Sequence, residues 1–194
     1  MASILNVDQI NNAAGTSAVT IDASTGKPSF PNGATLPAGS VVQVVSATKT
    51  SKFTTTSTSY TTITGLSVTI TPSSTSSKIL VSFDLNAGVV AAFGAIRLYR
   101  DATAIAIGDA INEPANNRVT VNVYNGGDDS NSTPNVSMST LDAPNSTSAI
   151  TYELKAGCVQ GSGTIVVNDQ TSQVRGQAYS GVSASTITVM EIAQ

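Results

Sequence analysis

Two short runs near the middle of the chain alternate between apolar and polar residues. Leu66–Thr71 (LSVTIT) places Leu, Val and Ile at every second position, and Ile79–Leu85 (ILVSFDL) repeats the pattern. A two-residue period sends alternate side chains to opposite faces of a β-strand. The connecting sequence PSSTSSK begins with Pro72, which cannot donate to a sheet ladder. We therefore predict an antiparallel pair of strands with one apolar face, which the rest of the chain covers.

Further strand-like segments follow at short intervals on both sides of this pair. Together they suggest about eight to ten strands, a spacing typical of an antiparallel β-sandwich with jelly-roll-like topology. Asp101-Ala102 predicts a two-residue hairpin turn, although alanine is a poor residue for positive φ. Ala87–Gly94 is rich in small residues, which predicts a bend or bulge. The other expected strands are Val41–Thr48, Phe53–Ser59, Ala95–Arg100, Thr103–Ile107, Arg118–Tyr124, Asn135–Leu141, Ser148–Lys155, Gly163–Asn168 and Ser185–Ile192.

The last expected strand carries apolar residues on both of its faces. Ile187 and Val189 share one face, and Met190 and Ile192 share the other. Because both faces of this terminal strand need cover, we predict that these four residues contribute to a subunit interface.

Residues 1–40, which we predict to form an extended N-terminal arm, differ in composition from residues 41–194, which form the predicted knob. The segment combines a few apolar residues with Asn, Ala, Gly and Pro, too few to build a core. It is either disordered or ordered by packing on other copies or a larger assembly. Its first apolar cluster fits a short helix as well as a strand, and we favour an anchoring role over a frayed tail. The predicted anchoring residues are Ile4, Leu5, Val7 and Ile10.

Composition argues against several classes of function. Charged residues make up 11% of the 194 residues and the net charge is −3, which gives no electrostatic basis for nucleic-acid binding. Arg97 and Arg100 have an odd spacing that predicts two separate surface charges. There is no His and one cysteine, Cys158, so a Ser-His-Asp or Cys-His relay is excluded. We expect no enzyme, cofactor, resident metal or membrane insertion.

Two loops are weak candidates for ligand contact. Asn125–Ser132 (NGGDDSNS) has oxygen-rich residues compatible with calcium, but its spacing is not that of an EF-hand, and a hairpin tip is the favoured interpretation. Tyr124 and Tyr179 adjoin loop-like sequence; packing at strand ends is favoured over carbohydrate stacking.

Several longer segments together carry a family resemblance. AGSVVQVVSATKT, TTSTSYTTITGLSVTITPSSTSSKILVSFDL, IRLYRDATAIAIGDA, LDAPNSTSAITYEL and STITVMEIA resemble segments of tailed-phage virion proteins from cyanobacterial and marine phages. Members are described as tail-fibre, head-fibre or capsid-decoration proteins. The resemblance covers about Ala38–Ile192, and it implies a homotrimer of jelly-roll knobs that N-terminal segments hold on the virion. The turn Asp101-Ala102 departs from the Asp-Gly usual in the family.

Two functional hypotheses follow from the residues and the resemblance. In the first, a non-enzymatic trimer is made in the bacterial host cytoplasm and decorates the outer virion surface, with the major capsid protein as partner. In the second, the chain is the receptor-binding tip of a tail fibre, contacting tail proteins and a host surface glycan. The loop residues assigned to host contact are Tyr124, Asn125, Asp128, Asp129, Asn131 and Tyr179.

Overall fold

The computed structural model describes residues 7–30, 36–90, 93–109, 118–123, 134–160, 163–170 and 181–194. The chain divides into two compact units, residues 1–37 and residues 38–194. All regular elements in the described residues are β-strands, and all their pairings are antiparallel. The predicted all-β class is therefore confirmed.

The N-terminal unit is a three-stranded sheet in the order β1-β2-β3. Its strands are β1 (Gln9–Asn11), β2 (Ser17–Ile21) and β3 (Pro28–Ser29). Ile10 lies on β1, whereas Ile4 and Leu5 lie outside the described residues. None of the described residues of this unit is buried, which agrees with the prediction that the segment cannot build a core.

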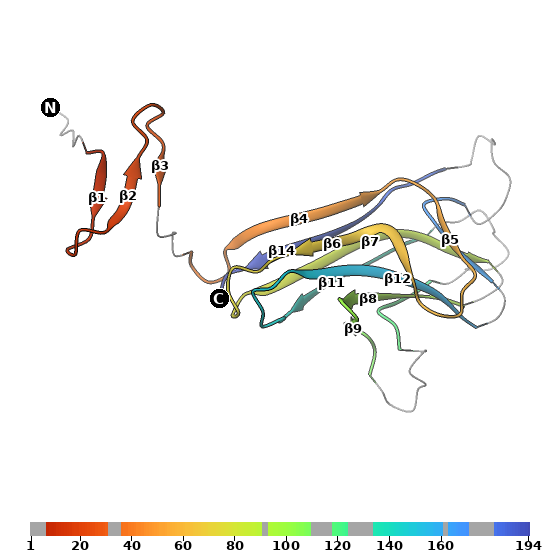
Figure 1. Cartoon of the computed structure of the whole chain (residues 1–194). Coiled ribbons are helices and arrows are strands. Elements are labelled where there is room, and N and C mark those ends of the chain that lie inside the picture. Colours follow the sequence, from red (N-terminus) through yellow and green to blue (C-terminus); the bar gives the residue numbers. More distant parts are fainter. Residues whose placement is uncertain are drawn as a thin grey trace. The chain divides into compact units, whose positions relative to one another are not determined.

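The larger unit, drawn from β4 to β14 in Figure 1, is a sandwich of two sheets. One sheet has the order β10-β8-β12-β6, with β9 also paired to β8; the other has the order β4-β14-β7-β13-β5, with β11 also paired to β7. The strands are β4 (Val41–Lys49), β5 (Phe53–Thr55), β6 (Thr61–Ile70), β7 (Lys78–Val90), β8 (Phe93–Arg100), β9 (Thr103–Ile105), β10 (Val121–Val123), β11 (Asn135–Asp142), β12 (Ile150–Gln160), β13 (Thr164–Val167) and β14 (Ser185–Ile192).

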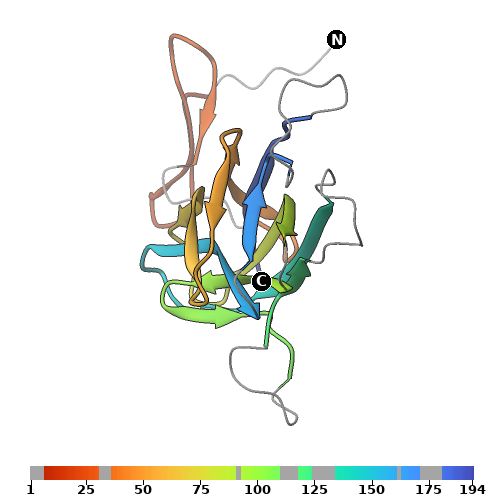
Figure 2. The same ribbon diagram turned by 90° about the vertical axis from the view of Figure 1, so that its right-hand side faces the viewer.

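A single apolar core fills the space between the two sheets. Inward side chains of both sheets contribute, because alternate residues of each strand point to the same side. The view in Figure 2 is turned so that it faces one end of these strands. The core includes Ile63, Leu66, Val68, Ile96, Leu98, Tyr152 and Leu154 from one sheet, and Ile79, Val81, Phe83, Leu85, Ile165, Ile187 and Val189 from the other.

The predicted pairing of Leu66–Thr71 with Ile79–Leu85 is wrong, although the predicted apolar faces are correct. β6 pairs with β12, whereas β7 pairs with β14, β11 and β13. The two strands lie in different sheets, so the PSSTSSK loop carries the chain from one layer to the other. The physical reason is a buried carboxylate of β14, Glu191, which binds this loop and is described below.

The hairpin predicted at Asp101-Ala102 is confirmed, because Arg100 pairs with Thr103. The turn requires a positive φ, which Asp101 adopts (51°) and Ala102 does not. Asp101 is also held from the neighbouring strand β12: its amide donates to the Thr151 carbonyl (2.8 Å), and its Oδ1 accepts from the Thr151 amide (2.9 Å). Alanine is therefore tolerated at the position where an Asp-Gly turn would have glycine.

The bend or bulge predicted over Ala87–Gly94 falls partly outside the described residues, which omit 91 and 92, but the described part does contain a close approach of backbone and side chain. From Ala87 to Val90, strand β7 pairs with β13. At Gly94 a Cβ atom would lie 3.1 Å from Cγ1 of Ile165, closer than an ordinary van der Waals contact, so a larger residue requires the Ile165 side chain to shift. Glycine at this position allows β8 to lie against the side chains of β13.

Candidate assembly surface

The outer face of the sheet containing β4, β14, β7 and β11 carries a continuous line of apolar side chains. The pairing register sets Met190 opposite both Val44 and Leu80, and sets Leu80 opposite Leu141. We call these four residues the apolar row. Val44 is 54% exposed and Leu141 is 58% exposed, and Leu80 and Met190 are partly exposed. Four apolar residues on neighbouring strands thus form one patch with no cover from the described residues.

A second apolar pair extends this patch toward the end of the sheet where β4 begins and β14 ends. Val41 pairs with Ile192, and Ile192 pairs with Lys78 on its other side. Val41 is half-exposed, and Ile192 is partly exposed. A contiguous apolar patch of this kind on a β-sheet is a typical protein-interaction surface.

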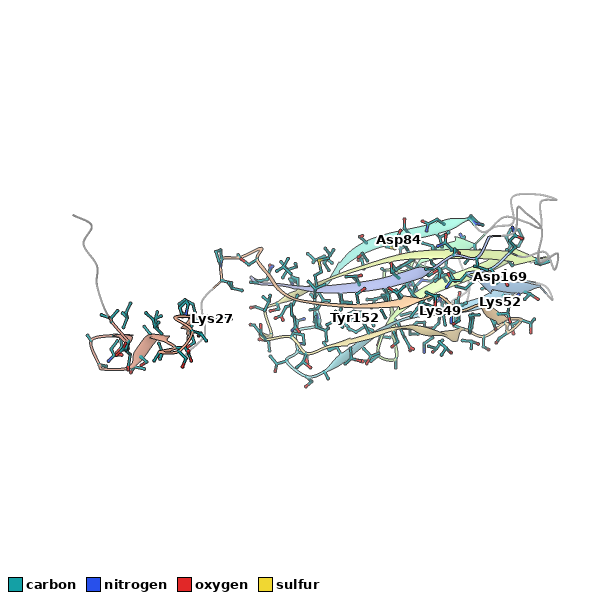
Figure 3. The ribbon with its side chains drawn as sticks, turned by 90° about the horizontal axis from the view of Figure 1, so that it is seen from above. Lys27, Lys49, Lys52, Asp84, Tyr152 and Asp169 are labelled. Atoms are coloured by element: carbon teal, nitrogen blue, oxygen red, sulfur yellow. The ribbon has the colours of Figure 1, made fainter. Side chains whose placement is uncertain are left out.

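Beyond the apolar row the same face is dominated by hydroxyl groups. Ser46, Thr188, Ser82 and Ser139 form the next row across the four strands. The Oγ of Ser46 and the Oγ1 of Thr188 lie 2.9 Å apart and share a hydrogen bond. The row after that includes one carboxylate, Asp84, on β7 (Figure 3). The face therefore has low charge and is apolar at one end only.

The structure separates the four predicted interface residues into two pairs. Ile187 and Val189 are fully buried in the chain's own core, so a second subunit cannot reach them; this corrects their assignment. β14 is a central strand between β4 and β7, and its inner face is covered by the opposite sheet. Met190 and Ile192 point to the outer face and belong to the apolar patch. Alternation along β14 places Met190 and Ile192 on one face. The pairing register that sets Val44, Leu80 and Leu141 beside Met190 involves other strands and cannot be derived from β14 alone.

The remaining predicted contact residues are only partly described. Val7 precedes β1 and is partly exposed, and Ile10 on β1 is 49% exposed. The predicted host-contact residues Tyr124, Asn125, Asp128, Asp129, Asn131 and Tyr179 lie outside the described residues, as does the loop considered for calcium.

The outer face of the other sheet carries a different group of side chains, which we call the cation–aromatic cluster: Tyr60, Arg97, Tyr99, Glu153 and Lys155. The Arg97 guanidinium lies 4.0 Å from the Tyr60 ring centroid, and Lys155 Nζ lies 4.3 Å from that of Tyr99. Lys155 Nζ is also 2.9 Å from Oε1 of Glu153. Such contacts hold flexible cations over aromatic faces.

The two arginines of β8 lie on opposite faces, as their spacing predicts, but they are not separate surface charges. Arg97 is only 9% exposed, and its Nε donates to the Arg118 carbonyl (2.6 Å). Arg100 points inward, and its Nη1 lies 2.9 Å from Oδ1 of Asp142 on the opposite sheet. The Tyr152 hydroxyl donates to the same carboxylate (2.7 Å). Burial, and to a smaller extent this hydrogen bond, raises the pKa of Tyr152. These bonds connect the two sheets.

Glu191 is a fully buried carboxylate at the end of the sandwich where β6 leads to β7. Its Oε1 accepts hydrogen bonds from the Ser73 amide (2.7 Å), the Ser73 hydroxyl (2.6 Å) and the Ser77 hydroxyl (2.6 Å). Its Oε2 accepts from Nε2 of Gln43 (2.6 Å). Burial alone would raise its pKa, but these donors stabilise the anion and lower the pKa to about 2. Glu191 therefore acts as an anionic clamp on the loop.

At the other end, Asn168 performs a similar connecting role with a neutral side chain. Its Nδ2 donates to the Lys49 carbonyl (2.7 Å), and its Oδ1 accepts from the Ser185 hydroxyl (2.5 Å). Next to it, Asp169 forms an ion pair with Lys52 (3.1 Å), and Figure 3 shows these two side chains at the same end of the molecule. Polar side chains thus connect the strands at both ends of the apolar core.

The one cysteine of the chain lies inside the sandwich. Cys158 is buried, its Sγ lies 3.3 Å from the Gly163 carbonyl oxygen, and burial raises the pKa of its thiol, which disfavours the reactive thiolate. Within the described ranges, no three acidic or cysteine side chains are grouped to hold a metal ion. Nor does that part of the chain contain a helix long and apolar enough to cross a membrane.

Comparison with models of known protein families gives no match, and comparison with curated protein sequences gives none either.

Proposed function

We propose that this chain is a non-enzymatic structural protein of a bacteriophage virion, a homotrimer that decorates the outer capsid surface. The observation that carries the proposal is the apolar row Val44, Met190, Leu80 and Leu141, which is uncovered in the single chain. A stable β-sandwich with an uncovered apolar face suits a protein that acts by assembly. The sequence resemblance to virion surface proteins supplies the biological setting.

Self-association is the part of the proposal that the apolar row supports most directly. Val44 and Leu141 are more than half exposed, so they contribute little to folding of the single chain. Covered by a neighbour, each would contribute about 1 to 3 kcal/mol to binding if it lies near the centre of the contact. In a closed trimer each contact joins two different surfaces, so the row packs against another face of the neighbouring copy.

Substitution of Leu141 by Thr tests this role. We expect roughly 5- to 100-fold weaker association by mass photometry or analytical ultracentrifugation, with unchanged thermal unfolding of the monomer. Ser139→Thr, on the same outer face and strand, is the matched control and should leave association nearly unchanged. Equal association constants for Leu141→Thr and the unmodified chain would contradict the role of the apolar row.

Attachment to the capsid is assigned to the N-terminal unit. A variant lacking residues 1–37 should keep the folded sandwich, because that unit is separate from residues 38–194, but should lose binding to the virion shell. A cryo-EM map of the virion then tests location: knobs at many shell positions are expected. Retained shell binding by the truncated chain would contradict the proposal.

The cation–aromatic cluster favours a second candidate, the receptor-binding tip of a tail fibre. Tyr60 and Tyr99 lie beside Arg97, Glu153 and Lys155 on one outer face, a combination that can contact sugar rings and their polar groups. In that case the purified chain should adsorb to susceptible cells and compete with phage, and Tyr99→Ala should reduce adsorption. In a cryo-EM map of the virion, density for this chain at the tail alone would favour the receptor-binding function over capsid decoration.

A further inference from the structure

The N-terminal sheet has one apolar face that none of the described residues of its own unit covers. Ile10 pairs with Val19, and Ile21 pairs with Pro28, so these side chains share one face of the sheet. Phe30 follows β3 directly, and an extended backbone there would return its side chain to the side of Pro28. We call Ile10, Val19, Ile21 and Phe30 the N-terminal apolar face. Ile10 and Phe30 are about half exposed, and Val19 and Ile21 are partly exposed.

The opposite face of the same sheet is polar. Gln9 pairs with Thr20, and Thr20 pairs with Ser29. No charged residue occurs in the three strands, whose sequences are QIN, SAVTI and PS. Asp8, Asp22 and Lys27 flank the strands at their ends, so the strands themselves carry no charge that would repel an identical copy or select a nucleic acid.

Local hydrogen bonds fix both turns of this sheet, so its two faces are defined by the sequence. The Oδ1 of Asn12 accepts from the amides of Ala14 (3.0 Å) and Thr16 (2.9 Å). The Oδ1 of Asp22 accepts from the Thr25 amide (2.7 Å) and hydroxyl (2.7 Å), and the Thr25 hydroxyl bond lowers the pKa of Asp22. Gly15 and Gly26 take the positive φ of the two turns (78° and 68°).

The size of the face decides how it can be covered. Three strands at about 4.8 Å spacing give a sheet roughly 10 to 15 Å wide. The strands have two to five residues and are roughly 7 to 17 Å long, so the face covers at most about 250 Å². That area is far below the roughly 800 Å² per partner of a standard interface, so two free copies would not associate through this face alone. None of the described residues of this sheet is buried, so the sheet gains little stability from apolar burial on its own. The face therefore needs partners that another contact already holds nearby.

We propose that the N-terminal apolar faces of the copies in one oligomer pack against each other and order the N-terminal sheets only after the knobs have assembled. The proposal rests on the proposed homotrimer. The sheet is followed by a connection of about ten residues to β4, which keeps identical faces at an effective concentration of the order of millimolar. Ile10 then contacts other copies, and attachment to the shell falls to the residues before β1.

Cysteine cross-linking tests this arrangement with two neighbouring residues. Val19→Cys lies at the centre of the apolar face on the middle strand, and Thr20→Cys lies on the opposite, polar face. A short bismaleimide should link Val19→Cys chains at least tenfold more efficiently than Thr20→Cys chains. The unmodified chain controls for Cys158, which is fully buried.

Native mass and hydrogen exchange of the same samples separate the outcomes. Dilution of the unmodified chain to monomers should lower the hydrogen-exchange protection factors of the β1–β3 amides at least tenfold. The protection factors of the sandwich amides should stay unchanged. An oligomer with equal cross-linking at both positions, or with N-terminal protection that survives dilution, would overturn the packing alone. If the chain is a monomer at every concentration, the proposed trimer is wrong. The packing of the N-terminal faces, which depends on the trimer, is then wrong too.

Discussion

Replacing Glu191 by Gln removes one negative charge from the loop clamp while preserving side-chain size. In the native chain four hydrogen bonds converge on the two carboxylate oxygens, from Ser73, Ser77 and Gln43. A glutamine has one carbonyl oxygen to accept them, and its NH₂ group would face at least one other donor. We expect the loop 71–77 to lose its fixed position between the sheets.

The expected loss of stability follows from the pKa of Glu191. The donors lower this pKa from 4.5 to about 2 in the folded chain. Each unit corresponds to about 1.4 kcal/mol, so the ionised form stabilises the fold by up to about 3 kcal/mol at pH 7. Breaking a buried charged network without replacing its donors costs a similar amount. Glu191→Gln should therefore lower the free energy of unfolding by about 2 to 3 kcal/mol.

The pH dependence has a definite sign. Because the folded pKa is lower than the unfolded one, the contribution of Glu191 is fully present above pH 4.5 and declines as pH falls toward 2. Urea unfolding of both chains should show a difference near its maximum at pH 7 that shrinks between pH 4.5 and pH 2. Hydrogen exchange should also accelerate selectively at the Ser73 and Ser77 amides.

Glu153→Gln is the matched control for the loss of one carboxylate. Glu153 lies on an outer face and bonds Thr62 and Lys155, so its replacement should cost less than about 1 kcal/mol. If Glu191→Gln is as stable as the unmodified chain at pH 7, or if their difference is independent of pH, the clamp does not stabilise the fold as reasoned here.

Three further substitutions test contacts inside the sandwich, each by chemical unfolding. Gly94→Ala would place Cβ 3.1 Å from Ile165 and should cost about 1 to 3 kcal/mol, with partial rescue by Ile165→Val; no loss would show that β13 yields easily. Asn168→Ala removes bonds to two strands from a residue with φ of 61°, and about 2 to 4 kcal/mol is expected; a loss under 1 kcal/mol would contradict the connecting role. Tyr152→Phe removes one bond to Asp142 and should cost about 1 to 2 kcal/mol, whereas an unchanged midpoint would show that this bond is dispensable.

Periodicity predicted the faces of the strands well, because a strand has only two faces and one of them is buried. Leu66, Val68 and Ile70 are all in the core as expected, and so is the alternating set that begins at Ile79. Pairing was predicted less well. A polar loop of seven residues can close a hairpin or cross between two sheets, and local sequence does not distinguish these courses.

The deciding contact in that case comes from residue 191, more than a hundred positions after the loop. Its three bonds to Ser73 and Ser77 connect the last strand to the crossing between the layers. The same limit applies to the candidate assembly surface: Met190 was identified from its own strand, but Leu141 joins it only through the register of β7. Long-range register had to come from the three-dimensional structure.

The apolar row is informative because folding of the single chain does not require it. Its inner counterpart, which includes Val45 and Val189, packs in the core, whereas Val44 and Leu141 on the outer face remain mostly exposed to water. The neighbouring row on that face is made of Ser and Thr, which shows that the same strands accept polar residues there. An uncovered apolar row on a sheet carries a risk of unspecific association. Such a row is best explained by a regular partner, and a neighbouring copy of this chain fits its low charge.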